Sequence, residues 1–447
     1  MTVATALDLA WVSTDPTLIA ASAIDRSGAV PDGLPVAVAR PMTVEQVQET
    51  VRAAAALGLV VVPRGAGTGM AGGALAGSGT LVLDLSALRS VSVDAGNRVA
   101  IVGAGVLTIE VDEAARRHGL RYSPDPASLA LSTIGGNIAT NAGGLRCAKY
   151  GDTRRAVRAL DVVLADGRLL RTGSALAPSV TGLDLTSLFV GSEGTLGVIV
   201  GATLALDPVP VDTRTLSARF DSAAAAGDAV SALVAAGVGA SLAELLDHAT
   251  LVALDDHLGT VLSGAQALLL VQTDGEGAAA ELDRAAEAIA PYAIGVDVAA
   301  DEAAGEALLV ARRQAFQAVE ARGRVLIEDV AVPVPRLAEA IAGIEAISRE
   351  AGVPVHQFAH ATRGIIHPLV SAQVAAGEPV PAHVQDVADA IFTTALSLGG
   401  SLSGEHGIGL LKRKWVSAEL DPVAHDVQRL ITSTLDPHGL LNPGKAI

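Results

Sequence analysis

The histidines of the C-terminal half have side chains that could carry out chemistry. His360 and His367 are seven residues apart, and Glu405 and His406 are adjacent in the run SGEHG at residues 403–407. Two imidazoles and one carboxylate form a ligand set for a divalent first-row metal with open coordination positions. Because a histidine pair at this spacing is more often structural, the residues alone leave both interpretations open.

A glycine-rich stretch in the first quarter of the chain forms a second candidate site. Residues 67–72 match the dinucleotide fingerprint G-x-G-x-x-G and follow an expected strand. That fingerprint requires a crossover helix, yet residues 64–79 hold seven glycines in sixteen positions, and each glycine costs a helix about 1 kcal/mol. We therefore expect a long loop whose bare amides approach a phosphate, with Arg64 adding charge. A flexible surface loop is the alternative.

Two further glycine-rich segments point to a larger ligand. Residues 133–144 combine four glycines, two asparagines and two threonines without a charged residue, and residues 190–197 form another such turn before a strand. Small side chains let the backbone wrap a flat ligand, while amides and hydroxyls satisfy its polar edges. One loop for a diphosphate and two for a heterocycle indicate a dinucleotide with a long ring system.

Caps and hydrophobic periodicity predict the elements that must hold these residues. Thr43 begins a helix that runs to Leu57, with Gln46 as its capping-box partner. Pro208 and Pro210 mark a boundary, after which helices alternate with strands. That order indicates an α+β arrangement of an antiparallel sheet with helices on one side. The expected strands are residues 59–63, 80–85, 98–102, 160–164, 197–206, 267–272 and 325–330, and the other expected helices include residues 223–236 and 276–290.

Composition and charge exclude several classes of protein. Half of the 447 residues are apolar and the net charge is −17, so the chain can bury a core and repels nucleic acid and anionic membranes. The single cysteine, Cys147, excludes a disulfide scaffold and iron–sulfur clusters. The stretch most like a membrane span, residues 229–243, is uncharged and apolar but shorter than the ~20 residues that span a bilayer. We therefore expect a cytoplasmic protein that carries no secretory signal and is not an integral membrane protein.

Five motifs together resemble a known family. They are PRGAGTGMAGGA at residues 63–74, STIGGNIATNAGG at 132–144, LFVGSEGTLGVI at 188–199, SGEHGIGLLKR at 403–413 and DPHGLLNPGKAI at 436–447. In this order they resemble the FAD-linked oxidases of the vanillyl-alcohol oxidase superfamily. Within that superfamily, the chain most resembles the branch of the D-2-hydroxy-acid dehydrogenases. This branch includes bacterial glycolate oxidase, D-lactate dehydrogenase and D-2-hydroxyglutarate dehydrogenase.

The resemblance implies an α+β fold with a defined order of domains. A two-subdomain FAD-binding domain of the vanillyl-alcohol oxidase type, also called PCMH-type, is followed by a ferredoxin-like α+β substrate domain, the cap. The expected segments are an N-terminal extension at residues 1–34, the FAD-binding domain at 35–210, the cap at 211–383, and a C-terminal segment at 384–447 that completes the active site and returns to the FAD-binding domain.

The resemblance also implies a non-covalent FAD. Superfamily members with covalent flavin usually carry a histidine in the diphosphate loop, where this chain has Thr68 and Met70. Residues 64–70 are expected to cradle the diphosphate, and Asn442 is expected to reach the isoalloxazine. The full set of expected FAD contacts is Arg64, Gly65, Ala66, Gly67, Thr68, Gly69, Met70, Pro124, Asp125, Ser128, Thr133, Gly135, Gly136, Asn137, Thr140, Gly143, Glu193, Gly194, Gly197, Ile199 and Asn442.

In this family, metal ligands and a base match residues of the C-terminal half. His360, His367 and Glu405 are implied to bind a divalent metal, zinc or manganese, which holds the substrate's hydroxyl and carboxylate and lowers the hydroxyl pKa. His406 is implied to accept the proton as the Cα hydride moves to flavin N5.

Two basic residues complete the implied catalytic set. Arg312 matches an arginine that pairs with the substrate carboxylate, a role suited to a bidentate guanidinium. Lys412 matches a lysine of the GEHGIG motif, and a solvated helix charge is its alternative interpretation.

The chain departs from the family pattern between the two histidines. Where the family usually carries an acid and an amide, this chain has Arg363 and Ile365. The substrate pocket must therefore differ, and Arg363 becomes a candidate for binding a second carboxylate of a D-2-hydroxy diacid or a longer-chain acid. The alternative is that Arg363 points to solvent or pairs with Glu328 or Asp329.

The sequence leaves three functions open. The first is an FAD-dependent dehydrogenase that converts a D-2-hydroxy acid to the 2-oxo acid and passes electrons to a quinone, a flavoprotein or another carrier. The second is a flavoprotein that oxidises a different alcohol without a metal. The third is a non-catalytic FAD-binding subunit of a larger oxidase, although the retained Glu405 and His406 argue against it. A homodimer is left open.

Overall fold

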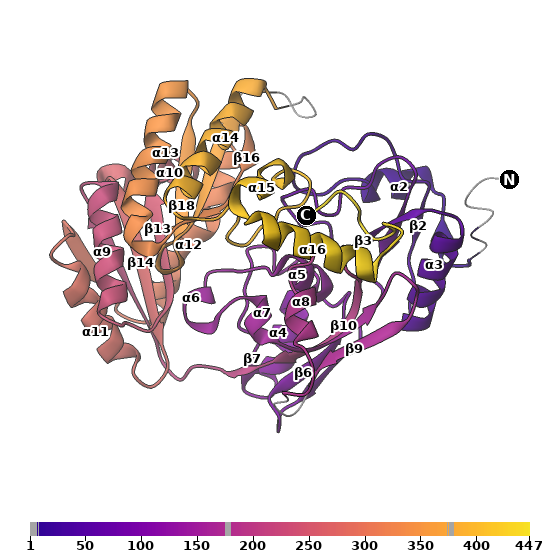
Figure 1. Cartoon of the computed structure of the whole chain (residues 1–447). Coiled ribbons are helices and arrows are strands. Elements are labelled where there is room, and N and C mark those ends of the chain that lie inside the picture. The colour runs from indigo at the N-terminus through magenta and orange to yellow at the C-terminus, as the bar shows by residue number, and fades with distance from the viewer. Residues whose placement is uncertain (1–6, 8, 175–179, 373, 375–379) are drawn as a thin grey trace. The chain divides into compact units, whose positions relative to one another are not determined.

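The computed structural model describes residues 7, 9–174, 180–372, 374 and 380–447. The chain forms two compact units (Figure 1). The first unit comprises Met1–Gly143, Gly151–Val209 and Glu405–Ile447, and the second comprises Gly144–Tyr150 and Pro210–Gly404. The chain therefore leaves the first unit and returns to it twice.

A four-stranded sheet with the order β1-β2-β4-β3 begins the first unit. β4 pairs in parallel with both β2 and β3, and β1 pairs antiparallel with β2. The helix predicted from Thr43 is confirmed: the Thr43 side chain accepts a hydrogen bond from the amide of Gln46. This helix, α3, buries Val47 and Val51 in the core beside the sheet. The bounds are β1 Val12–Ser13, α2 Pro16–Ser22, β2 Ala37–Ala39, α3 Val44–Ala56, β3 Val60–Arg64 and β4 Thr80–Asp84.

A five-stranded antiparallel sheet with the order β5-β6-β10-β8-β9 forms the rest of the first unit. Its strands confirm those expected at residues 98–102, 160–164 and 197–206. Short helices cover it and share a core that contains Tyr122, Ile134 and Phe189. The bounds are β5 Val91–Asp94, β6 Val99–Gly103, α4 Thr108–Arg116, β7 Leu120–Arg121, α5 Ile134–Thr140, α7 Thr153–Ala156, β8 Val157–Val163, β9 Leu169–Gly173, α8 Leu185–Phe189, β10 Val198–Ala205 and β11 Asp207–Pro208.

The two long glycine-rich segments differ in structure. Residues 65–79 join the parallel strands β3 and β4 without a helix, as their glycine content predicted. The second segment was expected to be a loop, but it contains the seven-residue helix α5. Thr133 explains the difference, because its hydroxyl accepts a hydrogen bond from the amide of Gly136 and caps the first turn. Asn141 ends the helix in a left-handed conformation.

The second unit is built on an eight-stranded antiparallel sheet. Its order is β15-β12-β14-β13-β18-β19-β16, and β17 also pairs with β19. The single strand expected at residues 325–330 is two strands, β16 and β17, separated by Glu328 and Asp329. The bounds are β12 Thr213–Phe220, β13 Ala240–Asp247, β14 Ala267–Asp274, β15 Gly295–Val298, β16 Arg324–Ile327, β17 Val330–Ala331, β18 Val355–His360 and β19 Ile365–Ala372.

The expectation that helices would cover one side of this sheet is wrong. Leu242 and Leu246 of β13 pack with residues of α10 and α12. The alternate residues Ala243 and Leu245 are equally buried, so the opposite face is covered as well. A sheet whose central strands are apolar at every position must be covered on both faces. The helices of this unit are α6 Cys147–Tyr150, α9 Ala223–Ala235, α10 His248–Leu258, α11 Ala278–Ile289, α12 Glu302–Glu320, α13 Leu337–Ala351 and α14 Ala382–Ser397.

The C-terminal segment returns to the first unit after Gly404. α15 (Val416–Glu419) and α16 (Pro422–Leu435) follow the GEHGIG motif, and Leu441 then forms an isolated bridge with Val61 of β3. Every helix in the described ranges is too short or too polar to span a lipid bilayer.

Candidate functional site

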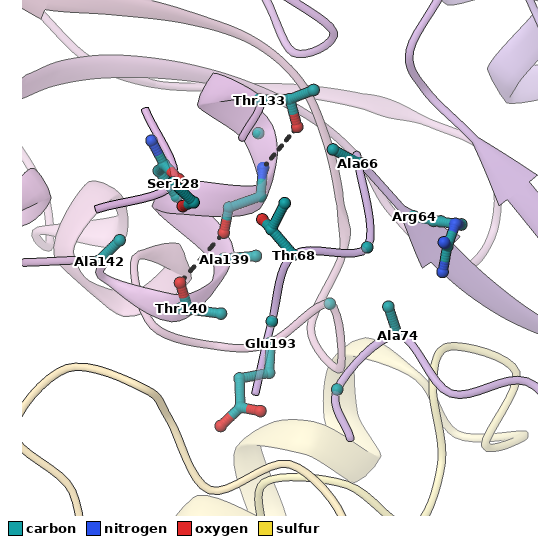
Figure 2. A pocket seen from close by; sticks show the side chains of 18 of the residues that line it. Arg64, Ala66, Thr68, Ala74, Ser128, Thr133, Ala139, Thr140, Ala142 and Glu193 are labelled. Carbon is teal, nitrogen blue, oxygen red and sulfur yellow. Dashed lines mark hydrogen bonds between the residues drawn. The ribbon is translucent and has the colours of Figure 1, made fainter. Parts of the chain in front are cut away.

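A cavity in the first unit is lined by all three glycine-rich segments (Figure 2). More than half of its lining residues are glycine or alanine, so backbone atoms face much of the interior. The lining residues are Pro63, Arg64, Gly65, Ala66, Gly67, Thr68, Gly69, Met70, Ala71, Gly73, Ala74, Leu85, Ala104, Pro126, Ala127, Ser128, Thr133, Gly135, Gly136, Asn137, Ala139, Thr140, Ala142, Gly143, Glu193, Gly194, Gly197, Ile199, Glu405 and His406.

The expected FAD contacts gather almost entirely at this cavity. Pro124, Asp125 and Asn442 are the expected contacts that do not line it. The lining also includes residues that sequence reasoning missed, among them Ala104 and Ala139. Ala139 lies inside a quoted motif and could have been found there, whereas Ala104 follows an ordinary strand and carries no local signal.

Close packing of the loops explains why the first segment needs glycine. A Cβ atom on Gly65 would lie 2.2 Å from the Thr133 hydroxyl oxygen, so only glycine lets the two segments meet there. Arg64 is the one arginine or lysine among the described lining residues, and its Nη1 donates to the carbonyl of Ile24. Burial lowers the pKa of the Arg64 guanidinium, and Asp25 and Asp84 oppose that shift. The cavity thus offers bare amides and one cation, a combination that fits a diphosphate.

Glu193 and Asn442 hold protein segments together beside the cavity. The Glu193 carboxylate accepts hydrogen bonds from the amides of Ile408 and Gly409, both at 2.8 Å. The Asn442 side-chain amide donates to the carbonyls of Gly73 and Glu193 at 2.9 and 2.8 Å. Burial raises the pKa of Glu193, while its two backbone hydrogen bonds lower it.

A buried polar cluster lies on one face of the sheet in the second unit. Glu244 of β13 stands opposite His360 of β18, and Phe358 of β18 stands opposite His367 of β19. Residues two apart on a strand point to the same face, so both histidines share a face with Glu244. Their rings meet edge to face with centroids 5.1 Å apart, and ring nitrogens of the two lie within 4.8 Å.

Arg312 of α12 completes this cluster. Its Nε donates to Glu244 at 2.5 Å, and its guanidinium lies 4.1 Å from the centroid of the Phe358 ring. The other oxygen of Glu244 is 2.7 Å from Nδ1 of His360. Glu244 therefore orients both residues, and Nε2 is the ring nitrogen of His360 that could bind a metal.

Sequence reasoning missed Glu244 entirely. It is completely buried in a strand whose other residues are mostly apolar. A lone carboxylate in an apolar strand was the available signal, because a buried charge needs a partner.

The residues around Glu405 and Lys412 are firmly placed. Gly404, the last residue of the second unit, donates its amide to Asp329 at 2.6 Å, and a Cβ atom on it would lie 2.6 Å from Ile365. Lys412 is 2% exposed, so its alternative interpretation as a solvated helix charge is wrong.

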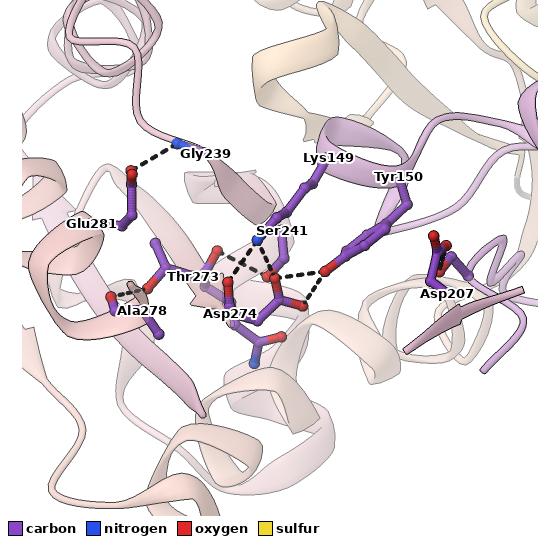
Figure 3. Close-up of polar contacts among 11 residues, drawn as sticks. Lys149, Tyr150, Asp207, Gly239, Ser241, Thr273, Asp274, Ala278 and Glu281 are labelled. Carbon is purple, nitrogen blue, oxygen red and sulfur yellow. Dashed lines mark hydrogen bonds and ion pairs between the residues drawn. The ribbon is translucent and has the colours of Figure 1, made fainter. Parts of the chain in front are cut away.

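Arg363 contacts the short helix α6. It is half-buried, and its Nη1 donates to the carbonyl of Cys147 at 3.2 Å. Figure 3 shows Lys149 and Tyr150 converging on Asp274: the Lys149 ammonium bonds the Asp274 carboxylate at 2.5 Å and the Tyr150 hydroxyl bonds it at 2.8 Å. α6 is therefore fixed to β14, and so is the carbonyl that Arg363 contacts.

Two family models together match most of the chain. The family model "FAD linked oxidases, C-terminal domain" matches residues 209–446, and "FAD binding domain" matches residues 35–173.

Curated relatives cover most of the chain. The chain is 37% identical to glycolate oxidase subunit GlcD of Bacillus subtilis, with 92% of this chain and 89% of that protein covered. It is 33% identical to D-lactate dehydrogenase of Archaeoglobus fulgidus, covering 92% of this chain and 91% of that protein. It is 35% identical to D-2-hydroxyglutarate dehydrogenase of Xanthomonas citri, covering 92% of this chain and 89% of that protein.

Solved structures share the fold at low sequence identity. p-Cresol methylhydroxylase with bound substrate has a TM-score of 0.78 at 16% identity, covering 98% of this chain and 93% of that one. Alkyldihydroxyacetonephosphate synthase has a TM-score of 0.71 at 17% identity, covering 97% of this chain and 82% of that one.

Proposed function

Since this chain belongs to the FAD linked oxidases and is an FAD-linked oxidoreductase of the hydroxy-acid dehydrogenase branch, we propose that it oxidises a D-2-hydroxy acid to the 2-oxo acid. The observation that carries the proposal is the buried cluster of Glu244, Arg312, His360 and His367. A guanidinium and two imidazoles on one sheet face suit a substrate that has a carboxylate beside a hydroxyl group. Electrons would leave to a quinone, a flavoprotein or a similar carrier.

The cavity of the first unit fits the cofactor. Bound FAD would supply the acceptor for the hydride that leaves Cα of the substrate. The amides of residues 65–70 and the charge of Arg64 would hold its diphosphate, and the small residues of α5 would let the ring system approach the backbone.

We expect the FAD to be held without a covalent bond. Residues 64–79 contain no histidine, cysteine or tyrosine, so this loop has none of the usual attachment side chains. Acid precipitation of the purified protein should leave the yellow colour in the supernatant. A flavoprotein with covalent flavin, treated in parallel, should keep its colour in the pellet, and the same behaviour here would contradict the expectation.

The donor set also fits a divalent metal, zinc or manganese. His360 and His367 would bind it through ring nitrogens, and Glu405 would follow from Gly404, which packs against Ile365 on the same strand as His367. Such a metal would lower the pKa of the substrate hydroxyl.

The chain's own residues would perform the remaining steps. Arg312 makes one hydrogen bond through Nε within the described structure, so its terminal nitrogens can form a bidentate pair with the substrate carboxylate. His406 would accept the hydroxyl proton, because a neutral imidazole is a suitable base near pH 7. Lys412, buried beside Glu193, would add positive charge near the segment that carries His406.

Arg363 supports a preference for diacids. It replaces an acid of the family pattern, and its Nη1 donates to the Cys147 carbonyl. At an effective dielectric of about 20, a unit charge pair at ~4 Å is worth roughly 4 kcal/mol before desolvation. A second substrate carboxylate near Arg363 would therefore be favoured over an uncharged chain.

Dye reduction with D-lactate, D-malate and D-2-hydroxyglutarate tests both the activity and the preference. Wild-type protein should reduce the dye with a D-2-hydroxy acid and not with the L-enantiomer. Arg363→Ala should lower kcat/KM for the two diacids by about 10-fold or more while changing D-lactate less. Equal losses on all three would refute the role of Arg363, and no activity with any D-2-hydroxy acid would refute the proposed function.

A further inference from the structure

The loop that carries His406 is anchored by a buried carboxylate of the same unit. Glu193 accepts hydrogen bonds from the amides of Ile408 and Gly409, two and three residues after His406. In Figure 2 the Glu193 carboxylate points away from Thr68 and Thr133. Its oxygens therefore accept hydrogen bonds from the backbone of residues 408–409.

A second anchor acts on the same loop. The carbonyl of Ala71 accepts from the amides of Leu410 and Leu411 at 2.9 and 3.1 Å. Gly409 has a φ of +53°, and a Cβ atom on it would lie 2.0 Å from that carbonyl oxygen. The GIG part of the motif thus lets the backbone lie directly on Ala71 and Glu193.

Glu193 is retained at an energetic cost. It is 7% exposed, and its backbone has a φ of 51°, in the left-handed region that non-glycine residues seldom adopt. A buried carboxylate is expensive unless it is hydrogen-bonded, and the two amide bonds meet this requirement. Such strain at a buried acid is typical of a residue that has a functional task.

We propose that Glu193 is a positioning residue for His406, holding residues 408–409 so that the imidazole keeps a fixed place at the cavity. This inference rests on the proposed role of His406 and adds to it, because the resemblance implied only a cofactor contact for Glu193. Both His406 and Glu193 line the cavity. A displacement of about 1 Å at a catalytic group can cost about 100-fold in rate.

The test uses Glu193→Gln, which keeps the shape but replaces one acceptor oxygen with an NH2 group. Amide hydrogen exchange of the FAD-free protein should show residues 408–409 exchanging about 10- to 100-fold faster. With FAD bound, the rate constant of flavin reduction at saturating substrate should fall about 10- to 100-fold. The KM and the Kd for FAD should stay within about threefold.

Asp436→Asn is the matched control. Asp436 is a buried carboxylate of the same unit that also accepts two successive backbone amides, those of Leu440 and Leu441, at 3.0 and 2.7 Å. This variant should speed exchange at residues 440–441 and leave flavin reduction within about threefold of wild type.

Three results would overturn the inference. They are unchanged exchange at residues 408–409 in Glu193→Gln, an unchanged reduction rate, or a loss that excess FAD restores, which would make Glu193 a cofactor contact. Failure of the proposed function is distinguishable, because wild-type protein would then show no flavin reduction with any D-2-hydroxy acid, whatever the exchange data for Glu193→Gln.

Discussion

Replacing His406 with alanine is expected to slow the reduction of bound FAD by about 10²- to 10⁴-fold, the usual contribution of a positioned general base. His406 lines the cavity of the first unit together with Glu405, and the chain that follows it is held by Glu193 and Ala71. Without the imidazole, water must accept the hydroxyl proton of the substrate. Stopped-flow absorbance of the flavin at saturating substrate measures the rate constant directly.

His438→Ala is the matched control for this experiment. His438 is an exposed histidine in the C-terminal segment of the same unit, and its removal should leave the rate within about twofold. If His406→Ala slowed reduction by less than about threefold with FAD and metal content retained, the base would have to be another group.

The second large effect is expected at Glu244. Glu244→Gln removes the negative charge that Arg312 and His360 share. Removing one partner of a buried ion pair typically costs about 3–5 kcal/mol, so we expect a loss of about 3 kcal/mol in the free energy of unfolding. Because Glu244 contacts His360, a proposed metal ligand, the substitution should also weaken metal binding about 10- to 100-fold. Urea unfolding and equilibrium dialysis with zinc or manganese measure the two effects.

Asp247→Asn, on the same strand, is a control that should change the free energy of unfolding in the opposite direction. Burial raises the pKa of Asp247 from 3.8 to about 6, and Asp247 caps α10 through the amide of Thr250. Its protonated form is favoured in the folded state, so its stabilising contribution is complete below pH 4 and is lost as the pH rises through 6. Asparagine resembles the protonated form and keeps the cap. Asp247→Asn should therefore gain up to about 3 kcal/mol at pH 7 and change little at pH 4.

The contrast between these two variants makes the prediction specific. If Glu244→Gln left the free energy of unfolding at pH 7 unchanged while Asp247→Asn raised it, the contacts of Glu244 with Arg312 and His360 would not stabilise the fold. A metal affinity unchanged in Glu244→Gln would likewise show that this carboxylate does not orient His360 toward a metal.

Local sequence was enough to predict the glycine-rich loops, many of the strands and the class of cofactor. These features depend on local chemistry: the glycine content of residues 64–79 excludes a helix, and Thr43 caps α3 through its own side chain. The motifs also indicated the family, and the two matching family models confirm it. The helix α5 escaped prediction because glycine-rich composition outweighed the single capping signal of Thr133.

Contacts between distant side chains depend on the folded chain and could not be predicted from local sequence. Glu244 and His360 are 116 positions apart, and sheet register alone sets them opposite each other. Glu193 and Ile408 are 215 positions apart, and their contact depends on the return of the chain to the first unit. Neither pair leaves a pattern in local sequence, because a strand or loop specifies its own conformation but not its neighbour. Burial then turns each of these pairings into a strong constraint, since an unpaired carboxylate in the interior would be too costly to keep.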